Sequence, residues 1–471
     1  MNELFFVIIY VLTRIILVYF FLINTLYLLF LVLSGFGIRR YRNLTTYISL
    51  NEVFRSPMAK PVSVLTPAFN EEMGIIQSAK ALLTLEYPQF EVIIINDGST
   101  DSTMEKLKKE FKLEKTRRVF RKVLDTKPIR GIYISKLDSR IVVVDKENGG
   151  KADALNTGLN VSRYPLFCTV DADSILEKDA LLKTVRPFLE NPDEVVGAGG
   201  IVRLSNGSEV RDGQVLKVKM PRNFLARFQI LEYFRAFLAG RMGLSMLKSV
   251  LIVSGAFAMF RKDVVLGCKG YRTSTVTEDM DLVVRIHKNM YKKKRKHRIY
   301  FIPDPICWTE GPESLRILGR QRNRWHRGLI DTLLYNGSML FNPRYRIIGM
   351  FALPFYFIFE MLGPLIEIIG YVSFVFFLVL GLINTTYAIL FFVLAVIYGI
   401  LISMSAILLE EYSVRIYPRV KDVFILALFG FLENFIYRQF LAFVRAMAFI
   451  DFFAGKREWG RMKRIGFDKP E

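Results

Sequence analysis

Three short groups of polar residues carry side chains that could catalyse group transfer, and all three lie between apolar segments. Asp171-Ala172-Asp173 comes first, Thr277-Glu278-Asp279 second, and Gln321-Arg322-Asn323-Arg324-Trp325 third. Moving a sugar from a nucleotide diphosphate to a hydroxyl needs positive charge at the leaving diphosphate. It also needs a base for the hydroxyl and a geometry that holds the two in line. The three groups supply a candidate for each requirement.

Asp171 and Asp173 follow a predicted strand over Phe167–Val170 and are one residue apart. Carboxylate oxygens bind hard divalent cations such as Mg²⁺ or Mn²⁺, which can bridge to phosphate oxygens. The same pattern is also common in ordinary polar turns. Asp97, in a turn after its own strand, could accept hydrogen bonds from a base or ribose. It could equally cap a helix predicted over Ser99–Leu107.

Asp279 lies where helical spacing begins, and the group from Gln321 to Trp325 follows a polar helical stretch. A carboxylate at a helix start is either a cap or, where it reaches an acceptor hydroxyl, a general base. Arg324 could neutralise a diphosphate through its fork of donors, and Trp325 offers a flat face for a sugar ring. An amphipathic helix with an Arg–acid pair explains the third group equally well.

The elements that position these residues are predicted to form an α/β domain beginning near Pro61. A parallel sheet with right-handed crossovers is expected, with polar turns at the carboxyl ends of its strands, where open α/β sheets bind ligands. Lys106–Lys136, rich in Lys and Arg, is interpreted as a solvated helix and loop. The other predicted strands and helix cover Val62–Thr66, Ile75–Leu85, Phe90–Ile95 and Ile141–Val144.

Both ends of the chain are apolar, and hydrophobic residues make up 52% of the whole. Leu4–Phe36 is longer than the roughly 20 residues that one crossing needs. We expect a transmembrane helix near Ile16–Leu33, preceded by an interfacial turn from which Arg14 snorkels. The basic residues of Arg39–Arg42 place this end of the helix inside and the N-terminus outside.

The later apolar segments carry charges that complicate their topology. Arg222–Val250 is expected to lie at the membrane interface, although core helices show the same pattern. Tyr291–Arg298 could contact anionic lipid heads or be a solvated loop. Ile347–Leu380 suits an interfacial or re-entrant piece plus one crossing, and Tyr387–Leu409 suits a clean span. Val423–Phe453 contains Glu433, Arg438 and Arg445, and charges inside a membrane usually face a helix bundle or a water-filled cavity. The basic tail after this segment favours the inside, which needs a hairpin or an in-plane helix, whereas a single crossing would put the tail outside.

Net charge and cysteine usage limit the remaining function classes. The formal charge of +21 would attract any polyanion, but the basic residues flank hydrophobic spans and no nucleic-acid-binding module is present. Cys168, Cys268 and Cys307 are widely spaced, which argues against a disulfide framework or a zinc site. This usage suits a catalytic domain in the reducing cytosol.

The polar groups, taken in order, resemble the processive family 2 glycosyltransferases, which include poly-N-acetylglucosamine, hyaluronan and cellulose synthases. The resemblance covers about 62–328 and extends in kind to the membrane helices. The last two motifs mark the membrane-integrated processive branch. The residues that carry it are Pro67-Ala68-Phe69-Asn70-Glu71, Asn96-Asp97-Gly98-Ser99, Gly150-Lys151 with Ala154-Leu155-Asn156, Asp171-Ala172-Asp173, Thr277-Glu278-Asp279, and Gln321 with Arg324-Trp325.

This resemblance implies a GT-A fold and a role for each matched position. Asp279 would deprotonate the acceptor and Asp173 would bind Mg²⁺ or Mn²⁺. Donor and nucleotide binding would fall to Pro67, Asn70, Glu71, Asp97, Lys151 and Asp171. Acceptor and diphosphate binding would fall to Ser254, Gly255, Glu278, Gln321, Arg324 and Trp325. The product would form with inversion, from an α-linked donor to a β-linked chain.

The sequence therefore predicts an α/β GT-A domain flanked by transmembrane and interfacial helices. Residues 1–45 would form the first helix, 46–345 the cytosolic domain, 346–455 the later membrane helices, and 456–471 a basic cytosolic tail. We expect a plasma-membrane enzyme of a bacterium or archaeon, without room for a cyclic-di-GMP-binding domain. One transmembrane helix is predicted before the catalytic domain, where poly-N-acetylglucosamine synthases usually have two.

The expected reaction is processive polymerisation of a UDP-sugar, with N-acetylglucosamine as the first candidate because of overall layout. Its partners would be the growing polysaccharide, membrane lipids and a small accessory membrane subunit, with no nucleic acid. Hyaluronan-type or cellulose-type synthesis and a non-processive enzyme that glycosylates a lipid are the alternatives. A catalytically silent scaffold conflicts with Asp171, Asp173 and Asp279, and a transporter conflicts with the large α/β insertion.

Overall fold

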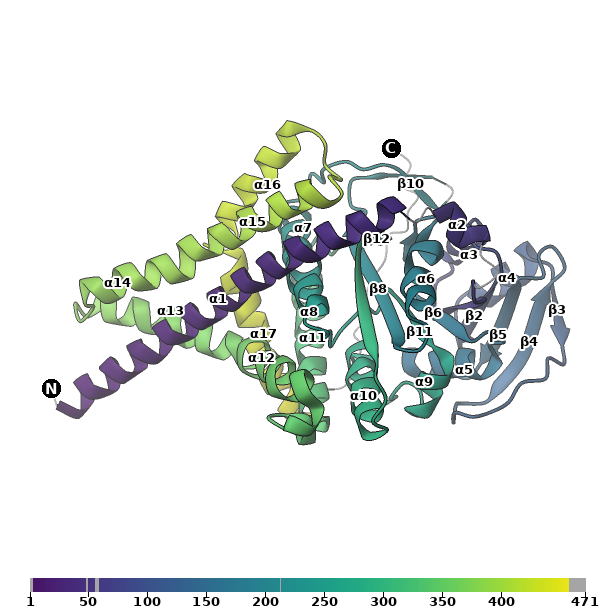
Figure 1. The fold of residues 1–471 in the computed structure, drawn as a ribbon, viewed down its shortest axis with the longest axis horizontal. Coiled ribbons are helices and arrows are strands. Elements are labelled where there is room, and N and C mark those ends of the chain that lie inside the picture. The colour runs from purple at the N-terminus through teal and green to yellow at the C-terminus, as the bar shows by residue number, and fades with distance from the viewer. Residues whose placement is uncertain (1–2, 48–49, 56–58, 212, 457–471) are drawn as a thin grey trace.

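A computed structural model describes residues 3–47, 50–55, 59–211 and 213–456, so the predicted basic tail lies outside it beyond Lys456. The described chain has two parts (Figure 1). An α/β body built on one large sheet occupies one side, and helices from both ends of the chain lie together on the other. The long N-terminal helix α1 (Glu3–Tyr47) connects the two parts.

The body contains a ten-stranded mixed sheet in the order β3-β4-β5-β2-β1-β6-β11-β8-β12-β7. Strands β5, β2, β1 and β6 are mutually parallel, as predicted, while β11 is antiparallel to β6 and β8. Outside this central group the sheet is mixed, because β3–β4, β4–β5 and β12–β7 pair antiparallel whereas β12 and β8 pair parallel. The strands are β1 (Val62–Ala68), β2 (Phe90–Asp97), β3 (Leu113–Thr116), β4 (Ile129–Ser135), β5 (Ile141–Lys146), β6 (Leu166–Val170), β7 (Ile175–Leu176), β8 (Val195–Leu204), β11 (Phe257–Arg261) and β12 (Arg298–Thr309), with a separate hairpin of β9 (Glu209–Arg211) and β10 (Gln214–Lys217).

The segment interpreted as a solvated helix and loop instead forms the outer edge of the sheet. Helix α4 (Thr103–Glu110) covers only the beginning of this segment. Strand β3 follows and pairs antiparallel with β4, which in turn pairs antiparallel with β5. Ile132 is buried in this pairing, whereas Glu114 and Lys115 on β3 and Arg130 on β4 are exposed. Edge strands tolerate charge, which is why the composition of this segment concealed its strands. Helix α4 also begins later than predicted, and the side chain of Asp101 accepts a hydrogen bond from Thr103 N at 3.0 Å.

Helices cover the sheet and present their first turns to its strand ends. Helix α5 (Lys151–Val161) follows β5, and α10 (Glu278–Lys292) precedes β12. The remaining helices of the body are α2 (Leu50–Arg55), α3 (Ile75–Leu83), α6 (Ala180–Glu190), α9 (Lys262–Gly267) and α11 (Leu315–Tyr335), followed by the short 3₁₀ turns η2 (Gly337–Met339) and η3 (Pro343–Tyr345).

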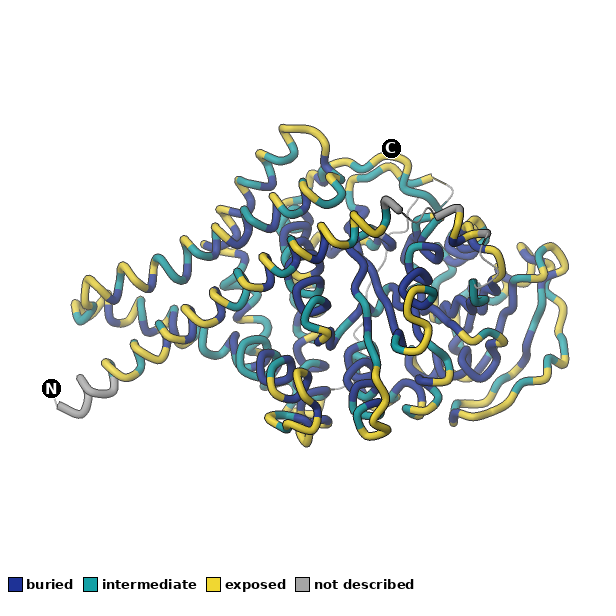
Figure 2. The backbone as a smooth tube through the Cα atoms, viewed as in Figure 1, coloured by how far each residue is buried: buried dark blue, intermediate teal, exposed yellow. Residues whose placement is uncertain are grey.

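Helix α1 is continuous, so the predicted interfacial turn near Arg14 is wrong. No Gly or Pro interrupts the chain from Glu3 to Ser34, and the guanidinium of Arg14 lies over the Tyr10 ring at 4.9 Å. Among the described residues, three helical segments are long and apolar enough to cross a membrane: Ile9–Thr45, Ile348–Val379 and Thr385–Ser413. Their outward faces are exposed (Figure 2) and largely apolar.

The other helices of this part surround α1 and contain several π-helical stretches. The apolar stretch predicted over Val423–Phe453 is divided into two helices, α16 (Val420–Leu432) and α17 (Tyr437–Phe453). The segment predicted at the interface comprises α7 (Phe224–Tyr233), the π-helix η1 (Phe234–Arg241) and α8 (Met242–Met246). The remaining elements are η4 (Ile348–Ala352), α12 (Leu353–Phe355), η5 (Tyr356–Met361), α13 (Gly363–Val379), α14 (Thr385–Phe392), η6 (Val393–Ile397) and α15 (Tyr398–Ser413).

Candidate active site

Every residue predicted for catalysis, donor binding, metal binding or acceptor binding lines one cavity of about 2580 Å³. The cavity lies at the carboxyl ends of the parallel strands, where chain reversals leave room for ligands. The predicted residues are separated by up to 258 positions in the sequence, from Pro67 to Trp325, so the fold brings them together.

Lys151, the first residue of α5, connects three parts of the site. Its Nζ lies 2.6 Å from Asp171 Oδ1 and 3.1 Å from Glu278 Oε1, and it donates to the Gly255 carbonyl at 3.3 Å. Burial alone would lower the pKa of this ammonium, but the charges of Asp171 and Glu278 raise it above its ordinary value. Lys151 is therefore a fixed positive charge between the end of β6 and the start of α10.

Asp279 lies in the first turn of α10, next to this cluster. Met280 N donates to its Oδ1 at 2.8 Å, and a Cβ placed on Gly255 would be 3.3 Å from Oδ2. Burial, and secondarily the charge of Glu278, raises the pKa of the Asp279 carboxyl above its ordinary value, while Lys151 opposes the shift. A carboxylate with a raised pKa accepts a proton more readily than an exposed aspartate, as a general base must.

The raised pKa of Asp279 predicts the acid side of the pH profile. The base acts only when deprotonated, so activity should fall as pH decreases through a pKa above about 4, the usual aspartate value. We expect kcat/KM to fall at a higher pH than it would if the base were an aspartate with an unshifted pKa. Initial rates between pH 4.5 and 8, with thermal stability checked at each pH, would measure this. A rate that stays flat to pH 4.5 would contradict the assignment.

Asp97 ends β2, and its carboxylate is occupied by hydrogen bonds. Lys146 Nζ lies 2.6 Å from Oδ1, Gly149 N donates to Oδ1 at 3.0 Å, and Gly150 N donates to Oδ2 at 2.7 Å. Asp97 thus holds the turn that begins α5 and orients Lys151, and its interpretation as a helix cap is wrong. Lys146, fully buried and also 2.7 Å from Asp153, was not predicted as a site residue. In the sequence, the signal for its role was a single lysine at the end of an apolar strand.

The loop after β1 is docked on the loop after β2. Asn70 has a positive φ of 56°, a conformation that asparagine tolerates better than most residues. Its backbone N–H donates to Ser99 Oγ at 3.0 Å, and Thr100 N donates to Asn70 Oδ1 at 2.8 Å. Glu71 N donates to Thr103 Oγ1 at 2.9 Å. These bonds align the two strand ends on one side of the cavity.

Asp171 and Asp173 both line the cavity and supply oxygen ligands suited to Mg²⁺ or Mn²⁺. The described residues contain no group of three or more His, Cys, Asp or Glu side chains placed to bind a metal. Mg²⁺ demands near-octahedral coordination, which two carboxylates cannot complete. The donor set therefore fits a cation that shares its coordination with the oxygens of a bound diphosphate.

Helix α11 carries Gln321, Arg324 and Trp325 on the cavity wall. Arg322, between them, donates to Gln321 Oε1 at 2.6 Å, pairs with Glu232 of α7 at 2.8 Å, and lies over the Trp325 ring at 4.2 Å. Trp325 keeps 38% of its surface exposed despite this contact. Arg322 was not predicted, although it determines how the predicted side chains are presented.

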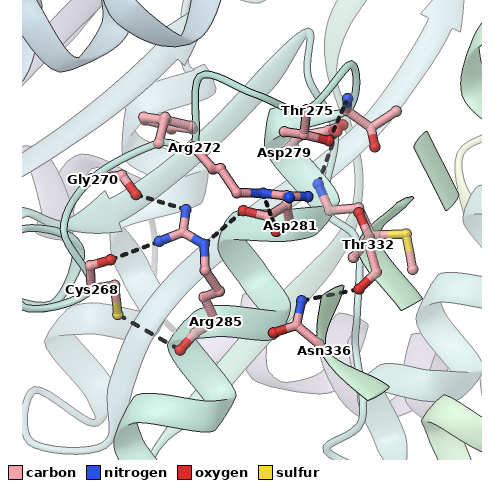
Figure 3. A network of polar contacts seen from close by, with 12 residues as sticks. Cys268, Gly270, Arg272, Thr275, Asp279, Asp281, Arg285, Thr332 and Asn336 are labelled. Carbon is pink, nitrogen blue, oxygen red and sulfur yellow. Dashed lines mark hydrogen bonds and ion pairs between the residues drawn. The ribbon is translucent and has the colours of Figure 1, made fainter. Parts of the chain in front are cut away.

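A buried ionic network behind Asp279 holds the start of α10 (Figure 3). Asp281 is fully buried; Arg285 Nε lies 2.6 Å from its Oδ2 and Arg272 Nε lies 3.2 Å from its Oδ1. Arg272 also pairs with Asp331 of α11 and lies 4.0 Å over the Tyr335 ring. The network therefore joins the helix that carries Asp279 to the helix that carries Trp325.

The loop from 268 to 272, which precedes α10 and includes Arg272, is also hydrogen-bonded to α5. Arg285 donates to the carbonyls of Cys268 and Gly270 at 2.6 and 2.7 Å, which fixes the loop from 268 to 272 (Figure 3). The side chain of Asn156, on α5, accepts from Tyr271 N at 2.7 Å and donates to Tyr271 O at 2.8 Å. Gly270 has a φ of 65°, and a Cβ there would be 2.3 Å from Asn156 Oδ1. One loop thus ties together the helices that carry Lys151, Asp279 and Trp325.

Asp281→Ala should destabilise the protein strongly, because it removes the buried counter-charge of Arg285 and one of the two carboxylates that pair with Arg272. Breaking a buried ion pair from one side costs about 3–5 kcal/mol. Thermal denaturation of the purified protein in detergent should show a clearly lower Tm. Asp263→Ala, which removes an exposed carboxylate on α9, is the matched control and should leave Tm nearly unchanged. Equal Tm values for the two variants would contradict a structural role for Asp281.

The cavity continues from the catalytic groups into the helices that contain the candidate spans. There the wall is polar as well as apolar: Arg445 Nη2 lies 3.0 Å from Glu360, and Tyr27 donates to Glu360 at 2.6 Å. Charged groups among membrane helices usually face a water-filled space. Other wall residues in this region are Phe20, Asn24, Glu367, Tyr371 and Arg438.

A mixed α/β sheet carries carboxylates and a lysine at its strand ends, and it is flanked by helices that are long and apolar enough to cross a membrane, here called the membrane-type helices. This combination defines a glycosyltransferase of the GT-A class. Residues 59–328 match the family model described as "Glycosyltransferase like family 2", and the chain belongs to that family. Residues 276–443 also match a model described as "Chitin synthase".

Curated relatives include poly-beta-1,6-N-acetyl-D-glucosamine synthases of Staphylococcus epidermidis and Staphylococcus aureus strain COL, each 28% identical over 274 residues. The aligned part covers 58% of this chain and 55% of each relative, so the chain spans about half the length of the curated relatives it matches. Among solved structures, the mannosyltransferase PcManGT from Pyrobaculum calidifontis, in complex with GDP-Man and Mn²⁺, aligns with a TM-score of 0.48 at 18% identity, over 92% of this chain and 99% of that one.

Proposed function

We propose that this glycosyltransferase polymerises a UDP-sugar into a β-linked polysaccharide, processively and with inversion, and passes the product across the membrane. One observation carries the proposal: the cavity that holds Asp279 and Asp171 extends into the membrane-type helices, to Glu360 and Arg445. A growing chain that stays bound after each transfer needs a continuous path away from the base. A single-sugar transferase needs no such path.

In the proposed reaction, Asp279 takes the proton from the acceptor hydroxyl while that oxygen attacks the anomeric carbon of the donor. Its raised pKa and its place beside Gly255 suit this role. Lys151, held between Asp171 and Glu278, and Arg324 would neutralise the departing diphosphate. Trp325 would stack on the acceptor sugar. The acceptor hydroxyl and the leaving diphosphate lie on opposite sides of the anomeric carbon, which inverts its configuration.

Asp171 and Asp173 would hold Mg²⁺ or Mn²⁺ together with the diphosphate. When bound, the cation supplies Lewis-acid stabilisation of the charge on the leaving group. Pro67, Asn70, Glu71 and Asp97 form the donor side of the cavity. Asp97 acts there mainly through the turn that it fixes, since its carboxylate already accepts bonds from Lys146, Gly149 and Gly150.

N-acetylglucosamine is the sugar that we propose. The support is the similarity of this chain to synthases named for poly-beta-1,6-N-acetyl-D-glucosamine. We place the α/β domain in the cytosol, where UDP-sugars are made, and the apolar helices in the plasma membrane. The basic residues at Arg39–Arg42 support this orientation.

The purified protein, reconstituted in lipid vesicles with Mg²⁺ or Mn²⁺, tests the proposal when radiolabelled UDP-sugars are supplied one at a time. Products would be sized and digested with linkage-specific hydrolases. High-molecular-weight β-linked material from UDP-N-acetylglucosamine is the expected result. Polymer from another donor would replace the proposed sugar, and only short lipid-soluble product would establish a non-processive enzyme.

A further inference from the structure

Arg241 is a charged residue on the cavity wall that the catalytic scheme above does not use. It ends the π-helix η1, an irregular helix type that is often found at functional sites. Its guanidinium lies 3.9 Å over the Phe237 ring, and its Nη1 is buried without a hydrogen-bond partner. Within the described part of the chain, no carboxylate forms an ion pair with it.

The other arginines in the inner part of the same cavity contrast with Arg241. Arg322 pairs with Glu232 at 2.8 Å, Arg445 pairs with Glu360 at 3.0 Å, and Arg235 pairs with Glu433. A half-buried charge without such a partner costs folding free energy, because lost hydration is not replaced. Residues that are kept in a costly state commonly serve a ligand. The unpaired state of Arg241 therefore indicates that its partner arrives from outside the protein.

The position of Arg241 identifies which ligand that is. Arg241 lines the cavity together with Asp279, the candidate base, and Tyr356 of η5, and both residues are close enough to influence its charge. The donor diphosphate is expected at Asp171, Asp173 and Lys151. The sugar whose hydroxyl reaches Asp279 must extend from the base toward the membrane part of the cavity, which is where Arg241 lies.

We infer that Arg241 binds the terminal sugar of the growing chain and selects an N-acylated sugar over one with a free amine. This inference rests on the proposed function. A guanidinium has five donors and no acceptor, so it binds the carbonyl oxygen of an acyl group well. An ammonium at the same position would be repelled by the fixed positive charge and would find no acceptor on Arg241. The residue thus acts as an acceptor-binding and specificity-determining group.

Arg241→Gln tests the inference in the full-length protein, with UDP-N-acetylglucosamine as donor and two acceptors. One acceptor is a short β-linked N-acetylglucosamine oligosaccharide and the other is its de-N-acetylated counterpart. We expect KM for the acylated acceptor to rise about tenfold or more, the loss expected for one charged hydrogen bond. KM for the donor should stay within about twofold, and the preference for the acylated acceptor should shrink. Arg241→Lys, which keeps the charge but not the fork, should fall between the two.

Thermal stability separates a ligand role from a structural one. Removing an unpaired, half-buried charge should leave Tm unchanged or raise it, whereas removing a structural ion pair lowers it. Lys248→Gln, which removes an exposed positive charge just after α8, is the matched control and should change neither KM nor Tm. An unchanged acceptor KM in Arg241→Gln, or a rise in donor KM instead, would overturn the inference.

Failure of this inference can be distinguished from failure of the proposed function. Wild-type turnover of UDP-N-acetylglucosamine is measured first, and its absence contradicts the proposed donor. Binding of the two oligosaccharides is then measured by calorimetry without any donor, which needs no turnover. Weaker binding of the acylated oligosaccharide by Arg241→Gln than by wild type supports the role of Arg241. Equal binding by the two proteins overturns it.

Discussion

Asp279→Asn should abolish polymer synthesis while leaving UDP-sugar binding intact. Asparagine keeps the size of the side chain and can still accept the hydrogen bond from Met280 N, but it cannot take a proton. Loss of a general base typically costs about 10²–10⁴-fold in rate. Incorporation of radiolabelled sugar measures the loss, and calorimetry with the UDP-sugar measures binding of the donor. The KM for the UDP-sugar should not be informative, because the expected change lies in kcat.

Two controls make this result specific. Asp263→Asn alters an exposed carboxylate that pairs with Arg261 on the surface, and it should retain full synthesis. Because Asp279 is near Lys151 and Arg241, the asparagine variant also removes a charge that both cations sense. A normal Tm for Asp279→Asn would show that this change leaves the fold intact. Retained synthesis would remove Asp279 from the role of base.

The central fold was predictable because its strands have a strong local signal. The cores of β1, β2, β5 and β6 are short runs of β-branched and apolar residues that end in polar turns, and they became buried parallel strands. The signal failed at β3 and β4, where edge position tolerates charge. It also failed at α1, where a single arginine beside Tyr10 was accommodated without breaking the helix.

The candidate site shows the same division between local and tertiary information. The sequence pattern was enough to select Asp171, Asp173, Asp279 and, on α11, Gln321, Arg324 and Trp325. Each of them lies at the end of a predicted strand or in a predicted helix. The pattern could not locate the partners that hold them, because these come from distant segments. Arg272 acts through Asp281 and Asp331, and its identity as a network residue depends on the packing of α10 on α11.

The cavity wall was the least predictable feature. Charges in the last apolar segments were expected to face a bundle or a water-filled space, and Arg445 and Arg438 do line the cavity. Which carboxylate each arginine meets was not accessible from sequence, and so the contrast between the paired arginines and Arg241 was not accessible either. That contrast requires the three-dimensional arrangement of η1, α11 and α17.

Asp173→Ala should remove the metal dependence of donor binding and reduce synthesis by about 10²-fold or more, since a Lewis-acid cation contributes several kcal/mol to the transition state. The two carboxylates of the pair differ in their surroundings. Asp171 Oδ1 is 2.6 Å from Lys151 Nζ, so this ammonium competes with a cation for that oxygen. Removing Asp171 would also remove a partner of Lys151, so the metal dependence is better tested at Asp173.

Calorimetry with UDP, with and without Mn²⁺, measures this prediction independently of turnover. In the wild type, Mn²⁺ should tighten UDP binding, and in Asp173→Ala it should have little effect. Asp193→Ala, which removes an exposed carboxylate outside the cavity, should behave as wild type. If Mn²⁺ tightens UDP binding equally in Asp173→Ala, the metal is held by other groups, and Asp171 with Lys151 displaced becomes the better candidate.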